Sequence, residues 1–334
     1  MSAAPDLSQA GPQGEGISAS GGVDNPGAGL QASAFFPPVV GPLRCLQAAG
    51  AELGEGLLWS VREQVLYWVD ILACQLHRLD PVSGDHSSWT FAEEISALAE
   101  RANAPGLIVT LRRGFALFDP ATDHEPRYLC QPEPELPGNR FNDGKCDAQG
   151  RFWAGSMDFA CEAPTGALYR YDPDGQCTRH DEGFVVTNGP TWALDAGRLC
   201  LYFNDTLSGS TYRYDCDSTT GTLSNKQLWN RFEPGDGLPD GLTTDALGRV
   251  WIAHWGSACV TCHNPVTAEE LGRVMLPVSQ VTTCTFGGPD LRTLFISTAR
   301  TGLTPEQLAA EPLAGGLFAV SVDAPGLPAN LFGG

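Results

Sequence analysis

The stretch NDGKCDAQGRFWAG at residues 142–155 decides the fold, because nearly the same pattern returns as DGLTTDALGRVWIA at residues 240–253. Each stretch begins with a carboxamide or carboxylate residue, passes through Asp-Ala-x-Gly-Arg, and ends in a strand with a central tryptophan. Asp and Gly at these places are typical of a tight turn, and the apolar residues around it are typical of antiparallel strands. The recurrence predicts a repeat architecture.

Further copies of the unit follow one another from residue 50 onward. Their strongly apolar second strands recur roughly every 40 to 50 residues, which is the period of a four-stranded propeller blade; these strands are at 65–69, 106–110, 151–155, 199–203, 249–253 and 293–297. Four third strands end in Asp-Pro or Asn-Pro, a pair that starts and caps a turn, and in unit four Asp215 followed by 218–221 takes this place. Six such units without helical patterns between them predict an all-β, six-bladed β-propeller.

The two ends of the chain are expected to behave differently. The last unit has too few residues for an outer strand, so we predict that Cys45–Ala49 supplies it and that N- and C-terminal strands close the ring. Residues 1–38 are rich in Gly, Ala, Ser and Pro and lack strand periodicity. They predict a disordered extension, with the propeller domain at 39–334.

The composition of the chain indicates which classes of binding partner it lacks and in which cellular compartment it is expected. The chain of 334 residues has 20 basic and 39 acidic residues, a net charge of −19, which disfavours nucleic acid and anionic membranes. It has no apolar run long enough to span a membrane, and no charged start followed by an apolar secretory core. The 11 cysteines show no framework spacing, so we expect mostly reduced thiols in a cytoplasmic protein that is a monomer or weak homo-oligomer.

Four units carry a polar residue where the innermost strand of a blade begins, beside the propeller axis. These residues are Glu55, Asn142, Asn188 and Asp240. Carboxylates crowded on an axis of low dielectric constant need a cation or hydrogen bonds to compensate them. The mixed oxygen set indicates one divalent metal ion, with Ca²⁺, Zn²⁺, Mn²⁺ and Fe²⁺ all left open. Alternatively, Asn-Gly and Asp-Gly are only turn formers, although Glu55 before Gly is not a favoured turn residue.

These residues lie in stretches that resemble the senescence-marker-protein/gluconolactonase/regucalcin family of sugar lactonases. The matching stretches are GEGLLW (54–59), NRFNDGKCDAQGRFWAGSM (139–157), NGPTW (188–192), PDGLTTDALGRVWIA (239–253), TTCTFGG (282–288) and AGGLF (314–318). The resemblance covers about residues 45–325 and implies a six-bladed propeller, so that 39–334 would be a lactonase domain. It also implies metal ligands at Glu55, Asn188 and Asp240, and substrate contacts at Arg140 and Asn142.

One departure from the family leaves the sugar undefined. Some members place a substrate-binding Glu shortly after the GSM element, where this chain has Ala160. Three alternatives stay open: Glu162 substitutes for it, Asp158 substitutes for it, or the contact is missing. The resemblance implies metal-dependent hydrolysis of a sugar (aldono-) lactone to the aldonic acid, with Asp240 as catalytic residue that orients or deprotonates water.

Two other functions stay open on the sequence. One is a calcium-binding or regulatory propeller without lactonase activity, and the other is a hydrolase of another ester. Arg140 argues against pure metal binding, because a metal site does not need it. Two further features are interpreted as structural: the CVTCH run at 259–263 matches a haem-attachment motif but falls on a predicted strand, and His254 is expected to be a packed core histidine.

Overall fold

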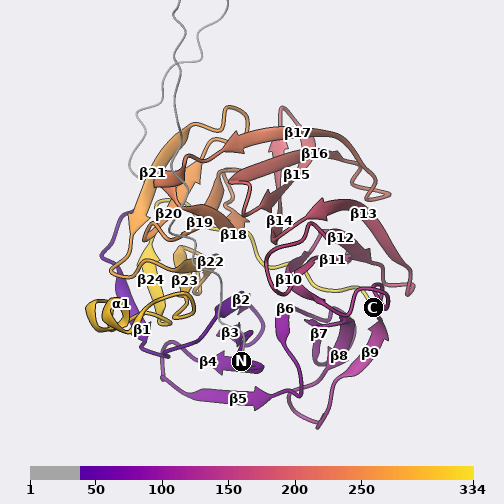
Figure 1. Cartoon of the computed structure of the whole chain (residues 1–334), viewed down its shortest axis with the longest axis horizontal. Coiled ribbons are helices and arrows are strands. Elements are labelled where there is room, and N and C mark those ends of the chain that lie inside the picture. The colour runs from indigo at the N-terminus through magenta and orange to yellow at the C-terminus, as the bar shows by residue number, and fades with distance from the viewer. Residues whose placement is uncertain (1–37) are drawn as a thin grey trace, which may run out of the picture. The chain divides into compact units, whose positions relative to one another are not determined.

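The computed structural model describes residues 38–334, which form twenty-four strands arranged as six four-stranded antiparallel sheets. The sheets stand around a common centre as the blades of a propeller (Figure 1). The prediction of a six-bladed propeller is therefore confirmed. The predicted disordered extension falls on residues outside the described part of the chain, Pro38 excepted, so the predicted domain boundary stays a prediction.

Each of the first five blades is built from consecutive strands, from the innermost outward. Blade 1 contains β2 (Gly54–Ser60), β3 (Val65–Asp70), β4 (Gln75–Leu79) and β5 (His86–Thr90); blade 2 contains β6 (Ile95–Glu100), β7 (Leu107–Leu111), β8 (Gly114–Phe118) and β9 (Arg127–Cys130). Blade 3 contains β10 (Asn139–Cys146), β11 (Phe152–Asp158), β12 (Gly166–Tyr171) and β13 (Cys177–Phe184). Blade 4 contains β14 (Thr187–Asp195), β15 (Arg198–Asp205), β16 (Ser210–Cys216) and β17 (Leu223–Arg231), and blade 5 contains β18 (Leu238–Thr244), β19 (Val250–Trp255), β20 (Cys259–His263) and β21 (Glu270–Met275).

Blade 6 joins the two ends of the propeller. Its strands are β22 (Val281–Gly287), β23 (Thr293–Thr298), β24 (Leu317–Ser321) and, on the outside, β1 (Arg44–Gln47). β1 pairs antiparallel with β24, with Cys45 opposite Phe318. The closing strand is thus supplied by the predicted segment, but it begins one residue earlier and ends two residues earlier than expected. Within residues 38–334, two short helices lie outside the blades: α1 (Pro305–Ala310) and the 3-10 turn Pro234–Asp236.

The Asp-Pro and Asn-Pro turns are capped as their residue types predict. The carboxylate of Asp80 accepts the N–H of Val82 at 2.8 Å, and the amide oxygen of Asn264 accepts the N–H of Val266 at 2.9 Å. In unit four the prediction was wrong by two residues. Asp215 lies within β16, and Asp217 caps the turn by accepting the N–H of Thr219 at 2.9 Å.

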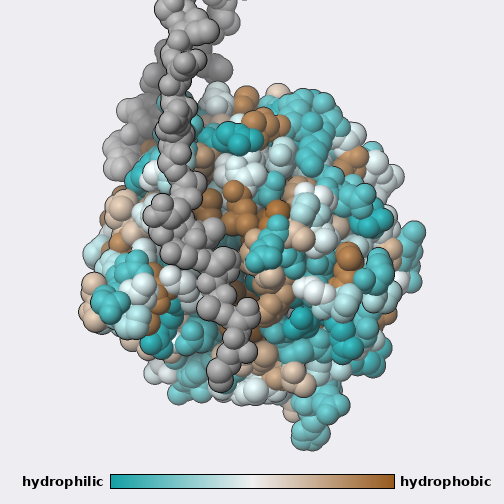
Figure 2. Space-filling model, viewed as in Figure 1, coloured by the Kyte–Doolittle hydropathy of each residue, from teal (hydrophilic) through white to brown (hydrophobic). Residues whose placement is uncertain are grey.

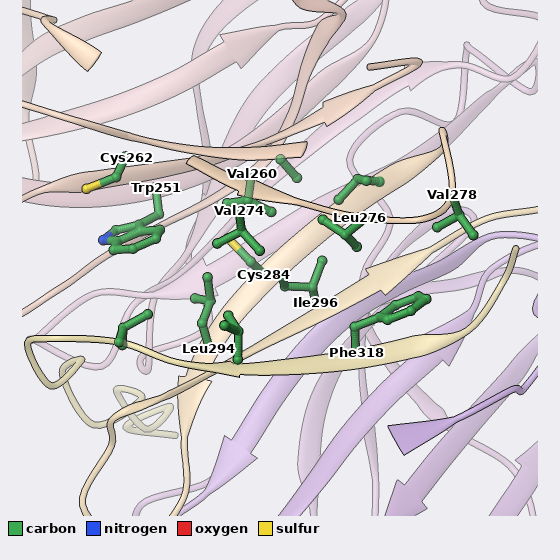
Figure 3. Close-up of a cluster of buried hydrophobic side chains, with 14 of the residues drawn as sticks. Trp251, Val260, Cys262, Val274, Leu276, Val278, Cys284, Leu294, Ile296 and Phe318 are labelled. Carbon is green, nitrogen blue, oxygen red and sulfur yellow. The ribbon is translucent and has the colours of Figure 1, made fainter. Parts of the chain in front are cut away.

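The hydrophobic core lies between the blades, since each sheet buries both faces against its neighbours. Figure 3 shows the cluster between blades 5 and 6, where Trp251 from β19 packs among aliphatic side chains of both sheets. Trp153 holds the same place in blade 3, where it faces blade 4, whereas Trp68 of blade 1 lies on the opposite face of its sheet and packs against blade 6. All three indoles are almost completely buried. On the face seen in Figure 2, hydrophilic residues cover most of the periphery. No helix within residues 38–334 has the length and apolar character needed to cross a membrane.

The C-terminal segment 325–334 crosses the propeller near its centre, as the yellow trace in Figure 1 shows. It bridges to blade 5 through Gly326, opposite Asp245, and to blade 2 through Phe332, opposite Arg101. The Phe332 ring is buried against the core of blades 2 and 3. The segment therefore ties three blades together at the end of the channel where the innermost strands finish.

Candidate metal and substrate site

The innermost strands all interrupt their regular pairing near their first residues. In the four strands with predicted site residues, the breaks lie between Glu55 and Leu58 in β2, Phe141 and Gly144 in β10, Asn188 and Thr191 in β14, and Pro239 and Leu242 in β18. The strands β6 and β22 have breaks of the same kind. Bulges of this kind re-aim side chains that a regular strand would point into a neighbouring sheet. In β14 the bulge requires glycine, because Gly189 has a φ of +96° and an added Cβ would lie 2.6 Å from Leu242.

All five predicted site residues are buried at this end of the channel. The exposed fractions are 4% for Glu55, 6% for Arg140, 7% for Asn142, 1% for Asn188 and 6% for Asp240. Polar side chains are rarely so buried unless they are paired or bind a ligand. Their common location agrees with the sequence alignment of the blades, while their roles stay predictions.

A chain of hydrogen bonds fixes the two carboxamides. The Nη1 of Arg140 donates to the Oδ1 of Asn142 at 2.6 Å, and the Nδ2 of Asn142 donates to the Oδ1 of Asn188 at 3.1 Å and to the carbonyl of Thr187 at 2.7 Å. The Nδ2 of Asn188 donates in turn to the Oγ1 of Thr206 at 2.9 Å. Each carboxamide oxygen accepts one of these bonds, so each keeps a free lone pair for a cation or a hydroxyl.

Three carboxyl groups lie within one another's electrostatic field. Burial, followed by the negative charge of Asp143, raises the pKa of Glu55 to about 8. Burial and the charges of Glu55 and Asp143 raise the pKa of Asp240 well above its usual range, and burial also raises the pKa of Asp143. The positive charges of Arg140 and Lys145 offset these shifts only in part. With all three groups ionised the site would hold more negative than positive charge, and a bound cation would favour that ionised state.

The donor set fits a divalent cation. Within residues 38–334, no three His, Cys, Asp or Glu side chains come close enough to hold a metal by themselves. The candidate set differs from such a cluster, because it combines the carboxylates of Glu55 and Asp240 with the carboxamide oxygen of Asn188. Oxygen ligands of mixed type suit hard cations, which often keep water or substrate oxygen in the remaining positions.

Asp143 makes no hydrogen bond to Arg140 or Lys145 within residues 38–334. Its carboxylate instead accepts the N–H of Gly144 at 2.7 Å and the N–H of Gly189 at 2.8 Å. Through Gly189 it holds the backbone directly after Asn188. Sequence spacing could not show this contact, because the two residues come from different blades.

The end of β11 and the loop after it contain Asp158 and Glu162, the two residues considered as replacements for the family's substrate-binding Glu. The carboxylate of Asp158 accepts the N–H groups of Glu162 at 3.0 Å and Ala163 at 2.9 Å, so it folds the loop. Glu162 is exposed, and neither acid contacts Arg140. The Arg140 guanidinium lies 5.8 Å from the centre of the Phe159 ring instead.

The rim contains residues that the sequence analysis missed. The guanidinium of Arg112 lies 4.9 Å from the same Phe159 ring and 3.5 Å from the carboxylate of Glu94. Cys161 lies close enough to Arg140 to raise its pKa, against the stronger lowering that burial causes. No motif links these positions, which come together only because blades 2 and 3 meet at the mouth.

The channel widens beyond the carboxylates. A cavity of about 570 Å³ is lined by the ends of the innermost strands, by Asp143 and Lys145, and by the C-terminal residues 327–330. Glu55, Asn142, Asn188 and Asp240 do not line it, so it lies on the far side of the bulges from the mouth. The ammonium of Lys145 is held there by the carbonyl of Leu242.

The two features interpreted as structural lie in blade 5. The CVTCH run forms the third strand, β20, and all five of its residues are buried. His254 is completely buried, its Nε2 lies 2.6 Å from the Oγ1 of Thr261, and burial lowers its pKa to about 3. A neutral, packed histidine is thus the state that this environment favours, as expected.

Comparison with known proteins adds independent findings. Residues 53–300 match the family model described as SMP-30/Gluconolactonase/LRE-like region. The 6-deoxy-6-sulfogluconolactonase of Pseudomonas putida is 38% identical over 293 residues, which are 87% of this chain and 99% of that protein. Human regucalcin is 31% identical over 84% of this chain and 94% of its own length. The crystal structure of a calcium-binding protein, regucalcin, from Agrobacterium tumefaciens has a TM-score of 0.82 at 28% identity, covering 90% of this chain and 99% of that chain.

Proposed function

The chain belongs to the SMP-30/gluconolactonase/LRE-like family, and from this premise we propose that it hydrolyses a sugar lactone to the open-chain aldonic acid with the help of one divalent metal ion. The proposed enzyme is a carboxylic ester hydrolase of the gluconolactonase type. The observation that carries the proposal is the site itself, where buried carboxylates outnumber the buried cations and a buried arginine lies beside them.

Glu55, Asn188 and Asp240 would hold the metal, since they supply two carboxylates and a carboxamide oxygen from three blades. When bound there, a divalent ion polarises the lactone carbonyl as a Lewis acid and stabilises the negative charge that develops on its oxygen. The native ion stays open among Ca²⁺, Zn²⁺, Mn²⁺ and Fe²⁺.

Asp240 is the proposed base. Its carboxylate is buried at the proposed metal position, and a carboxylate that binds the metal through one oxygen has a second oxygen that can accept the proton an attacking water must lose. Asp240 takes one proton from the water as its oxygen forms a bond to the carbonyl carbon. The bond from that carbon to the ring oxygen then breaks, Asp240 returns the proton to the ring oxygen, which leaves as a hydroxyl group, and the carboxylic acid that forms ionises. The products are the aldonate and one proton.

Arg140 and Asn142 are proposed to bind the substrate, with different hydrogen-bonding capacities. The structure gives Arg140 two hydrogen bonds, both through Nη1, and its other two nitrogens donate to no group in residues 38–334. They are free to bind sugar hydroxyls and the product carboxylate. Both N–H groups of Asn142 are already used, so this residue can only accept a hydrogen bond from a substrate hydroxyl.

The alternative is a calcium-binding propeller without catalysis, a reading that the described calcium-binding function of the Agrobacterium regucalcin favours. Two variants separate the alternatives. Asp240→Asn should lose both metal binding and lactone turnover, whereas Arg140→Gln should bind metal as the wild type does and turn over lactone with a raised KM. Metal binding would be measured by isothermal titration calorimetry and turnover by acid release. Full activity in Asp240→Asn would refute the proposed base.

The substrate partner under this proposal is a small sugar lactone. The cytoplasmic location and the monomeric or weakly oligomeric state stay predictions from the sequence.

A further inference from the structure

Two cysteines from neighbouring blades face each other away from the proposed active site. Cys130 ends β9, the outer strand of blade 2, and Cys177 begins β13, the outer strand of blade 3. Cys130 is paired across its sheet with Phe115, and Cys177 is paired across its sheet with Tyr171. The Phe115 and Tyr171 rings stack at 5.4 Å between the two blades.

This stack brings the thiols together. Both cysteines pack against the same hydrophobic cluster as the two rings, and the Cys130 thiol lies close enough to Cys177 to contribute to its raised pKa. The Phe332 ring, which anchors the C-terminal segment, lies 6.1 Å from the Tyr171 ring. The pair therefore lies where blade 2, blade 3 and the end of the chain meet.

Both residues are also partly exposed. Cys130 and Cys177 are free and half-buried, whereas six of the other cysteines are buried: Cys146, Cys200, Cys216, Cys259, Cys262 and Cys284. Accessibility and a thiol neighbour are the two requirements for disulfide exchange with a small oxidant. All eleven cysteines lie in the described part of the chain, and Cys130 and Cys177 are a pair that meets both requirements.

We propose that Cys130 and Cys177 form a reversible disulfide, with a low-molecular-weight disulfide such as oxidised glutathione as the oxidant. The bond would link the outer strands of blades 2 and 3 and stabilise the blade that holds Arg140 and Asn142. The proposal is independent of the lactonase activity.

The reaction has two exchange steps. The Cys130 thiolate attacks one sulfur of oxidised glutathione and forms a mixed disulfide, and one glutathione leaves. The Cys177 thiolate then attacks the Cys130 sulfur, and the second glutathione leaves. The two cysteines lose two protons and two electrons, which the two glutathione thiols retain. Burial and the neighbouring thiol raise the pKa of Cys177 and lower its share of thiolate.

Peptide mapping tests the proposal. The full chain is incubated with oxidised glutathione, free thiols are alkylated, and the non-reduced digest is examined by mass spectrometry. We expect a peptide containing Cys130 joined to a peptide containing Cys177, its disappearance after dithiothreitol, and a higher melting temperature for the oxidised protein.

Three variants make the test specific. Cys130→Ser and Cys177→Ser should each abolish the linked peptide and leave a glutathione adduct on the remaining partner. Cys45→Ser is the matched control, because Cys45 is exposed and lies on another blade, and it should keep the linked peptide. Separate glutathione adducts on Cys130 and Cys177, a different cysteine pair, or no oxidation at either residue would overturn the proposal. Mapping of the wild-type chain decides the question if a variant does not fold.

Discussion

The repeated Asp-Ala-x-Gly-Arg-x-Trp unit allows a quantitative test of the fold. In blade 3 the carboxylate of Asp147 accepts the N–H and the Nε of Arg151 at 3.1 and 2.5 Å, and the indole N–H of Trp153 at 2.9 Å. In blade 5 Asp245 accepts the same bonds from Arg249 at 3.0 and 2.6 Å, and from Trp251 at 2.9 Å.

The two arginines differ in their remaining partners. Arg249 also pairs with the carboxylate of Asp323, at 2.6 and 3.1 Å, whereas the other bonds of Arg151 go to the carbonyls of Ser218 and Thr219 and to a glutamine side chain. Asp147→Asn thus leaves a buried guanidinium without a carboxylate, a change that costs about 3 to 5 kcal/mol of stability. Asp245→Asn keeps one ion pair, and the loss of charged hydrogen bonds there costs about 1.5 to 3 kcal/mol.

Urea denaturation followed by far-ultraviolet circular dichroism measures both free energies of unfolding, without depending on the tryptophans that contact the mutated residues. Asp147→Asn should be the less stable variant, by roughly 1 to 3 kcal/mol on the same principles. Equal stabilities, or a larger loss in Asp245→Asn, would refute the reasoning that Asp323 compensates Arg249.

Three further predictions concern the bulge, the C-terminal segment and pH. Gly189→Ala should abolish lactone hydrolysis, since a Cβ there would lie 2.6 Å from Leu242 and displace the bulge; a wild-type rate would contradict this. Phe332→Ala should lower the free energy of unfolding, measured by urea denaturation, by about 3 to 5 kcal/mol. The neighbouring Leu331 side chain is 36% exposed, so Leu331→Ala should change the free energy of unfolding by less than about 0.5 kcal/mol. Burial lowers the pKa of His254 to about 3, so between about pH 6.5 and pH 3 the histidine binds a proton in the unfolded chain but not in the folded one. As the pH is lowered through this range, the free energy of unfolding should decrease by up to about 1.4 kcal/mol per pH unit. In urea denaturation at several pH values, His254→Gln should show a smaller decrease.

The blades could be predicted because their signals are local. An apolar second strand such as residues 249–253 and a capped turn such as Asp80-Pro81 need only short-range physics, and their recurrence gives the architecture. The closing strand followed from the short last unit. The turn in unit four was misplaced because both Asp215 and Asp217 precede it, and the sequence does not show which one caps it.

The candidate site was predictable only where it lies on the repeat. Alignment of the innermost strands brought Glu55 and Asp240 to one end of the channel, where the structure places them. The rim was not predictable, because Arg112 and Phe159 meet across two blades. The same holds for the contact from Asp143 to Gly189 and for the two thiols between blades 2 and 3, which depend on how sheets pack.

Metal-dependent lactone hydrolysis tests the proposed function most directly. The purified chain is stripped with a chelator, and acid release from D-glucono-, D-xylono-, L-arabinono- and D-galactonolactone is followed as Ca²⁺, Zn²⁺, Mn²⁺ or Fe²⁺ is added back. The proposal predicts loss of turnover on stripping and its return, well above spontaneous hydrolysis, with at least one pair of metal and lactone. A chain that binds metal but hydrolyses none of these lactones above background would contradict it.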